Sequence, residues 1–221
     1  MPDDDAPAPQ TWPPLTADQR RVLGVLIEKQ KTSKTADAYP MTLNSVVVGC
    51  NQKSNRDPVT DLDEDTVEET LGELQKAGLV MRMTGGRADR FRHLVYEQWR
   101  VTKVELAVLA ELLLRGSQTE GDLRGRASRM EVVTDVDELR GLLGSLAARN
   151  LVVYLSEKNR RGTVVTHGFY QPDELDGERA RHAGGAAEPA AEPRAGGKLD
   201  EVLAELAALK ERVARLEARL S

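Results

Sequence analysis

The chain has 221 residues, enough for one or two domains that each bury a small core. Aromatic residues make up only 4% of it, so the core must consist mainly of Leu, Val and Ala. The formal net charge of −5 excludes a uniformly basic nucleic-acid-binding protein but leaves room for a local basic patch.

The cysteine content and the N-terminal segment indicate in which cellular compartment the protein is found. The one cysteine, Cys50, allows no intramolecular disulfide and fits a reducing environment. Residues 1–14 are acidic and proline-rich, without the basic start and apolar stretch of a signal peptide, and we expect a disordered tail there. No apolar run approaches the roughly 18 residues of a membrane span. We therefore expect a cytoplasmic protein with no membrane partner.

An internal repeat organises the chain. Residues 67–80 carry the apolar pattern of a helix, a stop and a strand start, and residues 139–152 repeat it with the same spacing. Upstream, the helical pattern that begins at Thr16 recurs at Thr102. Because a repeat of this kind determines the architecture, the sequence predicts two similar modules over residues 15–97 and 98–170.

The first module is predicted to hold three helices and a hairpin. Thr16 and Gln19 stand at capping-box spacing at the start of the first helix. Gly78 supplies the left-handed residue that ends the third helix. We expect helices from Thr16, from Thr42 to Cys50 and over residues 63–77, and strands over residues 79–84 and 90–96.

The second module repeats this order. Thr102 and Glu105 form a second predicted capping box. A helix follows around Leu123, then a helix over residues 135–149 and strands over residues 151–156 and 163–170. The predicted fold class is therefore α+β, mainly α, with two tandem winged helix-turn-helix domains. The alternative is another small α+β module.

The C-terminal part differs in composition. Residues 171–197 are mainly Ala, Gly, Pro, Glu and Arg, which predicts a flexible, disordered linker. Residues 198–221 predict a coiled-coil helix with the heptad seam Leu199, Val202, Leu206, Leu209, Val213, Leu216 and Leu220. We expect this seam to form a homodimer; the alternative is an amphipathic helix that docks on the chain's own domains.

The sequence offers little for catalysis. His93 and His167 fall in predicted strands and His182 in the linker, and no spacing of His, Cys or carboxylate residues is typical of a metal site. Cys50 ends an apolar helix face, which favours a buried structural thiol over a nucleophile. We expect a non-enzymatic protein with no cofactor, no metal and no small-molecule substrate.

The polar loop over residues 51–58 is the most unusual stretch. Its Asn and Asp side chains are typical of residues that shape turns by bonding to the backbone, and Asp57-Pro58 fits a turn. Alternatively, Lys53, Asn55 and Arg56 could hold phosphates or the backbone of a partner.

Several runs resemble the YceH family of uncharacterised bacterial proteins. They cover residues 15–32, 37–40, 43–44, 50–59, 105–116 and 121–124. The resemblance spans about residues 15–170 and implies a tandem winged-helix fold, with a similar heptad helix in some members. It implies no known reaction, ligand or catalytic residue. The loop over residues 32–36 is slightly longer than the resemblance implies.

A winged helix normally places its third helix in the major groove of DNA. The first module argues against this, because residues 61–73 contain seven carboxylates and no Lys or Arg, which would repel phosphates. The candidate contacts to DNA or a partner are Lys53, Asn55, Arg56, Arg87, Arg90, Arg124, Arg126, Lys158, Arg160 and Arg161. The alternative for these cations is a solvated surface.

Two functions compete on this basis. We expect a DNA-binding, transcription-regulator-like protein in which the second module dominates the binding and contacts to the DNA backbone outweigh base readout. The alternative is a protein-binding scaffold, because an acidic third helix suits a basic protein partner as well as it disfavours DNA. Double-stranded DNA and another protein are thus the two candidate partners.

Overall fold

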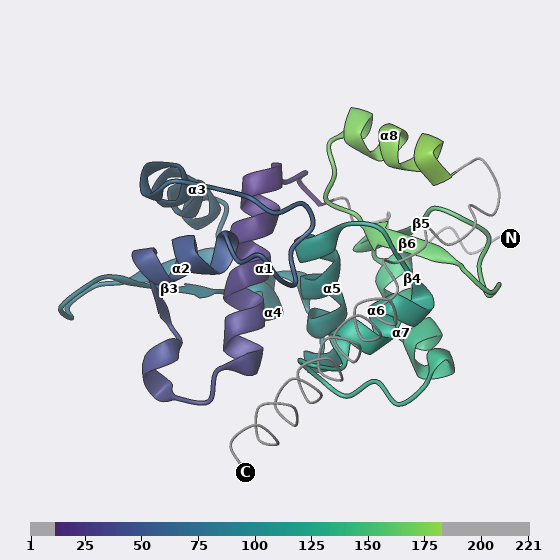
Figure 1. Ribbon diagram of the computed structural model, residues 1–221, viewed down its shortest axis with the longest axis horizontal. Helices are drawn as coiled ribbons and strands as arrows, with labels where there is room; N and C mark the ends of the chain where they lie inside the picture. The colour runs from purple at the N-terminus through teal and green to yellow at the C-terminus, as the bar shows by residue number, and fades with distance from the viewer. Residues whose placement is uncertain (1–11, 183–221) are drawn as a thin grey trace, which may run out of the picture. The chain divides into compact units, whose positions relative to one another are not determined.

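The computed structural model of the chain describes residues 12–182. The first half contains α1 (Ala17–Thr32), η1 (Ala36–Ala38), β1 (Met41–Thr42), α2 (Leu43–Cys50), α3 (Glu64–Lys76), β2 (Val80–Met83), β3 (Arg90–His93) and α4 (Val95–Trp99). The second half contains α5 (Lys103–Arg115), β4 (Gln118–Thr119), α6 (Glu120–Ala127), α7 (Val136–Ala148), β5 (Val152–Tyr154), β6 (Val164–His167) and α8 (Pro172–His182). The fold is a mixed α/β one in which helices predominate (Figure 1).

One order of elements occurs twice. A long helix, a short strand, two helices and two strands make up the first repeat (residues 16–94) and again the second repeat (residues 102–168). Each repeat has an antiparallel three-stranded sheet, ordered β1-β3-β2 and β4-β6-β5. The register also matches, since Met41 pairs with Phe91 and Gln118 with Val165. The short strands β1 and β4 were not predicted.

Local signals in the sequence place the helix ends. Both predicted capping boxes are confirmed, because the Thr16 and Thr102 side chains accept from the third helical residue, which bonds back to the cap. Gly78 has the expected positive φ of 73° after α3. The predicted strand over residues 90–96 is too long, because β3 ends at His93 and α4 follows.

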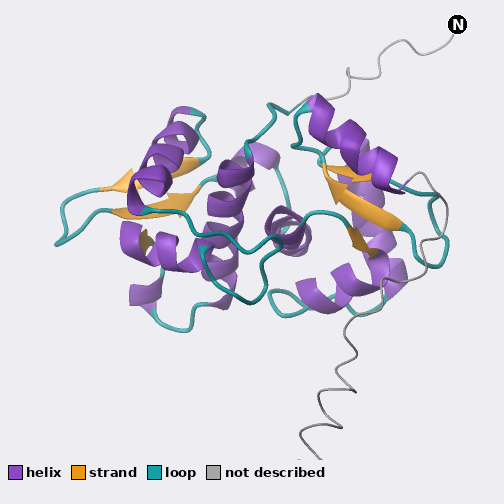
Figure 2. Ribbon diagram, turned by 45° about the horizontal axis from the view of Figure 1, so that its top comes forward, coloured by secondary structure: helices purple, strands orange, loops and turns teal. Residues whose placement is uncertain are grey.

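The two long helices α1 and α5 lie side by side at the centre (Figure 1). Every residue from Arg20 to Glu28 is buried, so α1 is covered on all sides. Gly24 allows α5 to pack this closely on α1. Any larger residue would place a Cβ only 2.9 Å from Cγ of Leu114 on α5. Figure 2 shows the two sheets on opposite sides of these central helices. Both repeats therefore share one hydrophobic core and belong to one compact unit.

Two segments predicted to be disordered are ordered in part. The predicted tail over residues 1–14 is wrong for its last residues, because the Trp12 indole N–H donates to the Arg149 carbonyl at 2.7 Å. The predicted linker over residues 171–197 is wrong where α8 forms. Arg20 holds that helix by two 2.8 Å hydrogen bonds to Glu174. The remaining tail and linker, and the coiled-coil seam over residues 199–220, lie outside the described residues.

The sequence predicts no membrane-spanning segment, and the helices of the structure can be compared with that prediction. Among residues 12–182, no helix combines the length and the apolar character that crossing a bilayer requires.

Candidate functional site

Arg56, a predicted contact to DNA or a partner, is buried. Its side chain has no exposed surface, and Nη2 lies 2.6 Å from Oε2 of Glu28 on α1. Its Nε donates to the Gly49 carbonyl at 3.0 Å, and Nη2 donates to Gln52 at 3.0 Å. The prediction for Arg56 is therefore wrong, because a guanidinium held in this way cannot reach a ligand outside the chain.

Three other residues of the polar loop are also engaged by the chain itself. The Asn51 side chain donates to the Leu62 carbonyl and accepts from the Leu62 N–H, both at 2.8 Å. Asn55 has a φ of 59° and accepts a 3.0 Å hydrogen bond from Arg115 on α5. The Asp57 N–H donates to the Leu114 carbonyl at 3.0 Å. These contacts favour the turn-shaping interpretation of the loop and join it to the second repeat.

The loop adjoins a network of charges between the repeats, in which the carboxylates of Glu28 and Glu111 are buried. Arg129 connects the two long helices, because it lies 2.6 Å from Glu28 and 3.0 Å from Glu111. Arg115 adds a 2.8 Å contact to Glu111. Burial alone would raise the pKa of Glu28, but hydrogen bonds and charge from Arg56 and Arg129 bring it below its usual value. Sequence reasoning missed this network because its members are far apart in the chain.

Three more predicted contacts are satisfied within the chain. Arg90 donates to the carbonyls of Asp37 and Pro40 at 2.8 and 2.7 Å. Arg124 donates to the Thr134 carbonyl at 3.3 Å. Arg126 donates to the Gln118 side chain at 2.8 Å. These hydrogen bonds hold loops and strands in place and occupy N–H donors that a ligand would otherwise use, although neutral acceptors leave the positive charge itself in place.

The remaining candidates are more exposed. Lys158, Arg160 and Arg161 share the turn between β5 and β6, where Lys158 lies 4.7 Å from the Tyr154 ring centroid and Arg160 pairs with Glu157 at 2.6 Å. Within residues 12–182, the exposed cations Lys53, Arg87 and Arg161 form no hydrogen bond or ion pair. Lys158, Arg160 and Arg161 thus form a group of three exposed candidate cations on one turn.

The third helix of each repeat presents little free positive charge. The exposed carboxylates of α3 are Glu64, Asp65, Glu68, Glu69 and Glu73. On α7, Arg140 pairs with Glu120 at 3.0 Å. Arg149, directly after α7, pairs with Glu105. The expected repulsion between α3 and phosphates therefore rests on side chains that face solvent.

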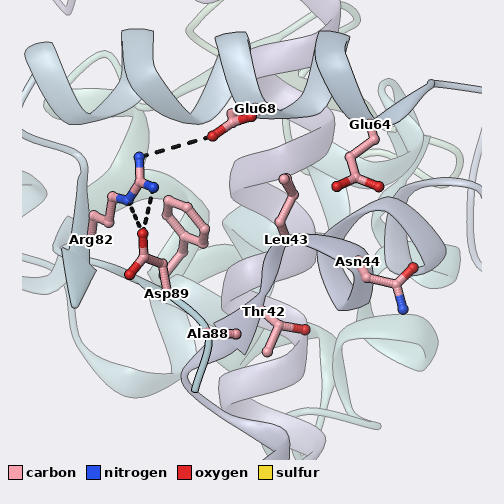
Figure 3. Close-up of a pocket in the computed structure, with 9 residues that line it drawn as sticks. Thr42, Leu43, Asn44, Glu64, Glu68, Arg82, Ala88 and Asp89 are labelled. Carbon is pink, nitrogen blue, oxygen red and sulfur yellow. Dashed lines mark hydrogen bonds and ion pairs between the residues drawn. The ribbon is translucent and has the colours of Figure 1, made fainter. Parts of the chain in front are cut away.

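A pocket of about 380 Å³ lies on the first repeat, between α2, α3 and the β2–β3 hairpin. Figure 3 shows Glu64 and Glu68 extending into it from α3, opposite Leu43. Arg82 stands at one end, bonded to Asp89 and 3.9 Å from Glu68. The residues that line the pocket are Thr42, Leu43, Asn44, Glu64, Glu68, Arg82, Ala88, Asp89 and Phe91. Two of the three carboxylates in the lining, Glu68 and Asp89, thus lie beside the one guanidinium, and Glu64 lies apart from it (Figure 3).

The matching place on the second repeat is arranged differently. Glu120 begins α6 as Leu43 begins α2, and Arg140 takes the place in α7 that Glu68 has in α3. These two residues form an ion pair in which the Glu120 side chain is only 5% exposed. Glu120 and Asp137 raise the pKa of Arg140, with the Glu120 hydrogen bond as the largest cause. The second repeat thus holds its own guanidinium–carboxylate pair at this position.

The other titratable candidates are buried. Burial raises the pKa of the Cys50 thiol to about 12, so the thiol stays protonated, as expected of a structural cysteine. Burial also lowers the pKa of His93 to about 4 and that of His167 to about 3. Within the part of the chain that the structure describes, no three His, Cys, Asp or Glu residues are grouped to hold a metal ion.

Comparison with known proteins gives the family. The model of a protein family of unknown function, DUF480, matches residues 15–162. The chain belongs to the DUF480 family. Family members with similar sequences are called UPF0502 proteins. One from Rhodopirellula baltica is 45% identical over 162 residues, which are 73% of this chain and 67% of the relative. Another, from Pseudomonas savastanoi pv. phaseolicola, is 39% identical over 92% of both chains.

These DUF480 relatives confirm the resemblance to uncharacterised bacterial proteins. A further relative from Geobacter sulfurreducens is 49% identical over 130 residues, or 58% of each chain. The family match covers the polar loop, α3 and the pocket. None of the names states an activity, so the function must be argued from the surfaces of the two repeats.

Proposed function

We propose that this DUF480 protein is a non-enzymatic, protein-binding scaffold built from two tandem winged-helix modules. The module assignment is supported by the repeated order of three helices and a hairpin, with a short strand that closes each sheet. We place the protein in the cytoplasm, in line with its single, buried thiol.

The acidic solvent face of α3 carries the proposal. A protein that reads DNA needs cations at the phosphates, because the release of counterions supplies much of the affinity. Five exposed carboxylates on α3 offer the opposite charge, and its one cation, Lys76, lies at the last residue. Such a face attracts a basic protein and repels a DNA backbone.

DNA binding through the second repeat is the competing proposal. The observation that favours it is the group Lys158, Arg160 and Arg161, whose exposed turn lies where a wing meets the DNA backbone in winged-helix proteins. Two of these cations already interact with Tyr154 and Glu157. Only Arg161 is fully available, so we expect weak, salt-sensitive contacts rather than sequence readout.

Self-association completes the proposed arrangement. We propose that the heptads over residues 199–220 form a homodimer, which would present each binding surface twice. Two linked weak contacts bind more tightly than one, because the second contact forms within an already assembled complex.

Affinity purification from the native host, with nuclease treatment, tests the proposal. We expect a defined protein partner to be retained in near-stoichiometric amount after nuclease digestion. In parallel, fluorescence anisotropy with random-sequence duplex DNA at about 50 to 200 mM salt measures the competing activity. If no partner is retained and micromolar DNA binding falls steeply with salt, the scaffold proposal is wrong. Loss of that binding in the Arg160→Ala/Arg161→Ala variant would then assign it to the turn.

A further inference from the structure

The pocket on the first repeat has the two surfaces that a long basic side chain requires. Leu43, Ala88 and Phe91 contribute apolar lining, against which the methylene stem of Arg or Lys can pack. Glu64 and Glu68 extend over this lining from α3 and can hold the charged end (Figure 3). The volume of about 380 Å³ falls in the range of roughly 300–1,000 Å³ that is typical of ligand pockets.

Charge decides which occupant fits. Glu64, Glu68 and Asp89 line the pocket together with one cation, Arg82, which is already bonded to Asp89. The beginnings of α2 and α3 add about half a positive charge each, which is less than the carboxylates supply. An anion such as a phosphate is therefore repelled, and a cation gains both hydrogen bonds and favourable Coulomb energy.

At the matching position, the second repeat contains an ion pair between an arginine and a carboxylate. There the guanidinium of Arg140 extends from α7 to the buried carboxylate of Glu120 at 3.0 Å. The first repeat has Leu43 and Glu68 at the corresponding positions, so a carboxylate stands where the second repeat has its cation. The first repeat's own cation, Arg82, is bonded to Asp89 and approaches Glu68 only to 3.9 Å. The pocket therefore keeps an excess of negative charge that a second cation, from outside the module, can balance.

We infer that this pocket binds an arginine or lysine side chain from a basic segment of a partner protein. The inference rests on the proposed protein-binding function and names the chemistry and the position of one contact. The apolar stem lies against Leu43 and Phe91, and the charged end lies between Glu64 and Glu68.

A peptide titration of the full chain tests the inference. The probe is a fluorescein-labelled decapeptide in which arginine and alanine alternate, and its anisotropy is followed against protein concentration. The Glu64→Gln/Glu68→Gln variant is expected to weaken binding at least tenfold. The matched control, Asp65→Asn/Glu69→Gln, removes the same charge from a neighbouring stripe of α3 and is expected to weaken binding less than twofold. A peptide with citrulline in place of arginine is expected not to bind.

A second variant introduces into the first repeat the ion pair that Glu120 and Arg140 form in the second repeat. Leu43→Glu/Glu68→Arg places a carboxylate and a guanidinium where Glu120 and Arg140 stand, and it is expected to abolish binding with an unchanged circular dichroism spectrum. If this variant does not fold, the Glu64→Gln/Glu68→Gln comparison still decides the question.

Three results would overturn the inference. They are no peptide binding at millimolar protein, equal weakening by the pocket and control variants, or binding of the citrulline peptide with the same affinity. Affinity purification of the native partner distinguishes a failure of this inference from a failure of the proposed function. If the Glu64→Gln/Glu68→Gln variant retains the partner as well as the wild type does, the pocket is not the contact but the scaffold proposal stands. If the wild type retains no partner, the scaffold proposal itself fails.

Discussion

Arg56 and Glu28 form a nearly water-free ion pair, with 2.6 Å between Nη2 and Oε2 and side-chain exposures of 0% and 3%. Arg56 comes from the polar loop after α2, whereas Glu28 lies near the end of α1. The pair therefore fixes the loop against the helix that both repeats share. Removing one partner of such a pair leaves the other charge buried.

Arg56→Ala is expected to lower the free energy of unfolding by about 3–5 kcal/mol, because Glu28 loses its most buried partner. Urea denaturation followed by circular dichroism measures this. The control, Lys53→Ala, changes an exposed cation of the same loop and is expected to stay within about 0.5 kcal/mol of the wild type. A loss below about 1 kcal/mol for Arg56→Ala would contradict the structural role of the pair.

Two helical glycines are expected to respond in opposite directions to alanine. Gly24→Ala places a Cβ 2.9 Å from Leu114 at the joint between the repeats, so we expect a loss of about 1 kcal/mol or more. Gly72→Ala meets nothing within 4 Å on α3, so the better helix propensity is expected to stabilise the protein by about 0.5–1 kcal/mol. Thermal unfolding of both variants checks this. The same sign for both would contradict the close approach of α1 and α5.

The buried histidines predict loss of stability in mild acid. Burial lowers the pKa of His93 to about 4 and that of His167 to about 3, so both stay neutral in the folded chain. The unfolded chain takes up protons below about pH 6.5 and thereby gains stability relative to the folded one, down to the folded-state pKa values. Each histidine is expected to cost about 2 kcal/mol between pH 6.5 and pH 5.

Urea denaturation at pH 7.5, 6.5 and 5 measures this dependence. Glu28 contributes only at lower pH, because its pKa shift acts below the ordinary value of 4.5. His93→Gln, which keeps a neutral polar group near Gln30, is expected to remove about half of the slope. An unchanged slope in this variant would assign the acid sensitivity to other groups.

The attachment of α8 is expected to depend on Glu174. Glu174→Ala removes two hydrogen bonds to the buried Arg20 guanidinium, each worth about 1.5–3 kcal/mol when charged groups are involved. Amide hydrogen exchange in α8 is therefore expected to accelerate at least tenfold by mass spectrometry. Asp173→Ala, an exposed neighbour in the same turn, serves as the control and should have little effect. Equal exchange in both variants would contradict the anchoring role of Glu174.

Features that depend on neighbouring residues in the chain could be predicted from the sequence. The capping boxes at Thr16 and Thr102, the apolar stripe of α3 and the left-handed Gly78 each arise from residues within one turn of each other. The internal repeat then gave the order of elements twice. These signals specify local conformation and the face that each helix buries.

Features that depend on distant partners were missed. Arg56 has the side chain of a typical phosphate contact, and only the fold brings it to Glu28. The composition of residues 171–197 is typical of disorder, yet Arg20, more than 150 residues earlier, holds part of this segment as α8. The pocket is built from residues that are as far apart in the chain as Thr42 and Phe91. The contrast between Leu43 and Glu120 at matching positions becomes visible only when the two repeats are aligned by their sheets.

The shared packing of α1 and α5 has a consequence for recognition. Since Gly24 lets the helices touch and both repeats within residues 12–182 share one core, the surfaces of the two repeats keep one distance and one orientation. A partner that contacts both surfaces need not immobilise a linker, so its second contact costs little entropy. The same rigidity selects against partners whose contact points have a different spacing, so geometry discriminates between partners of equal charge.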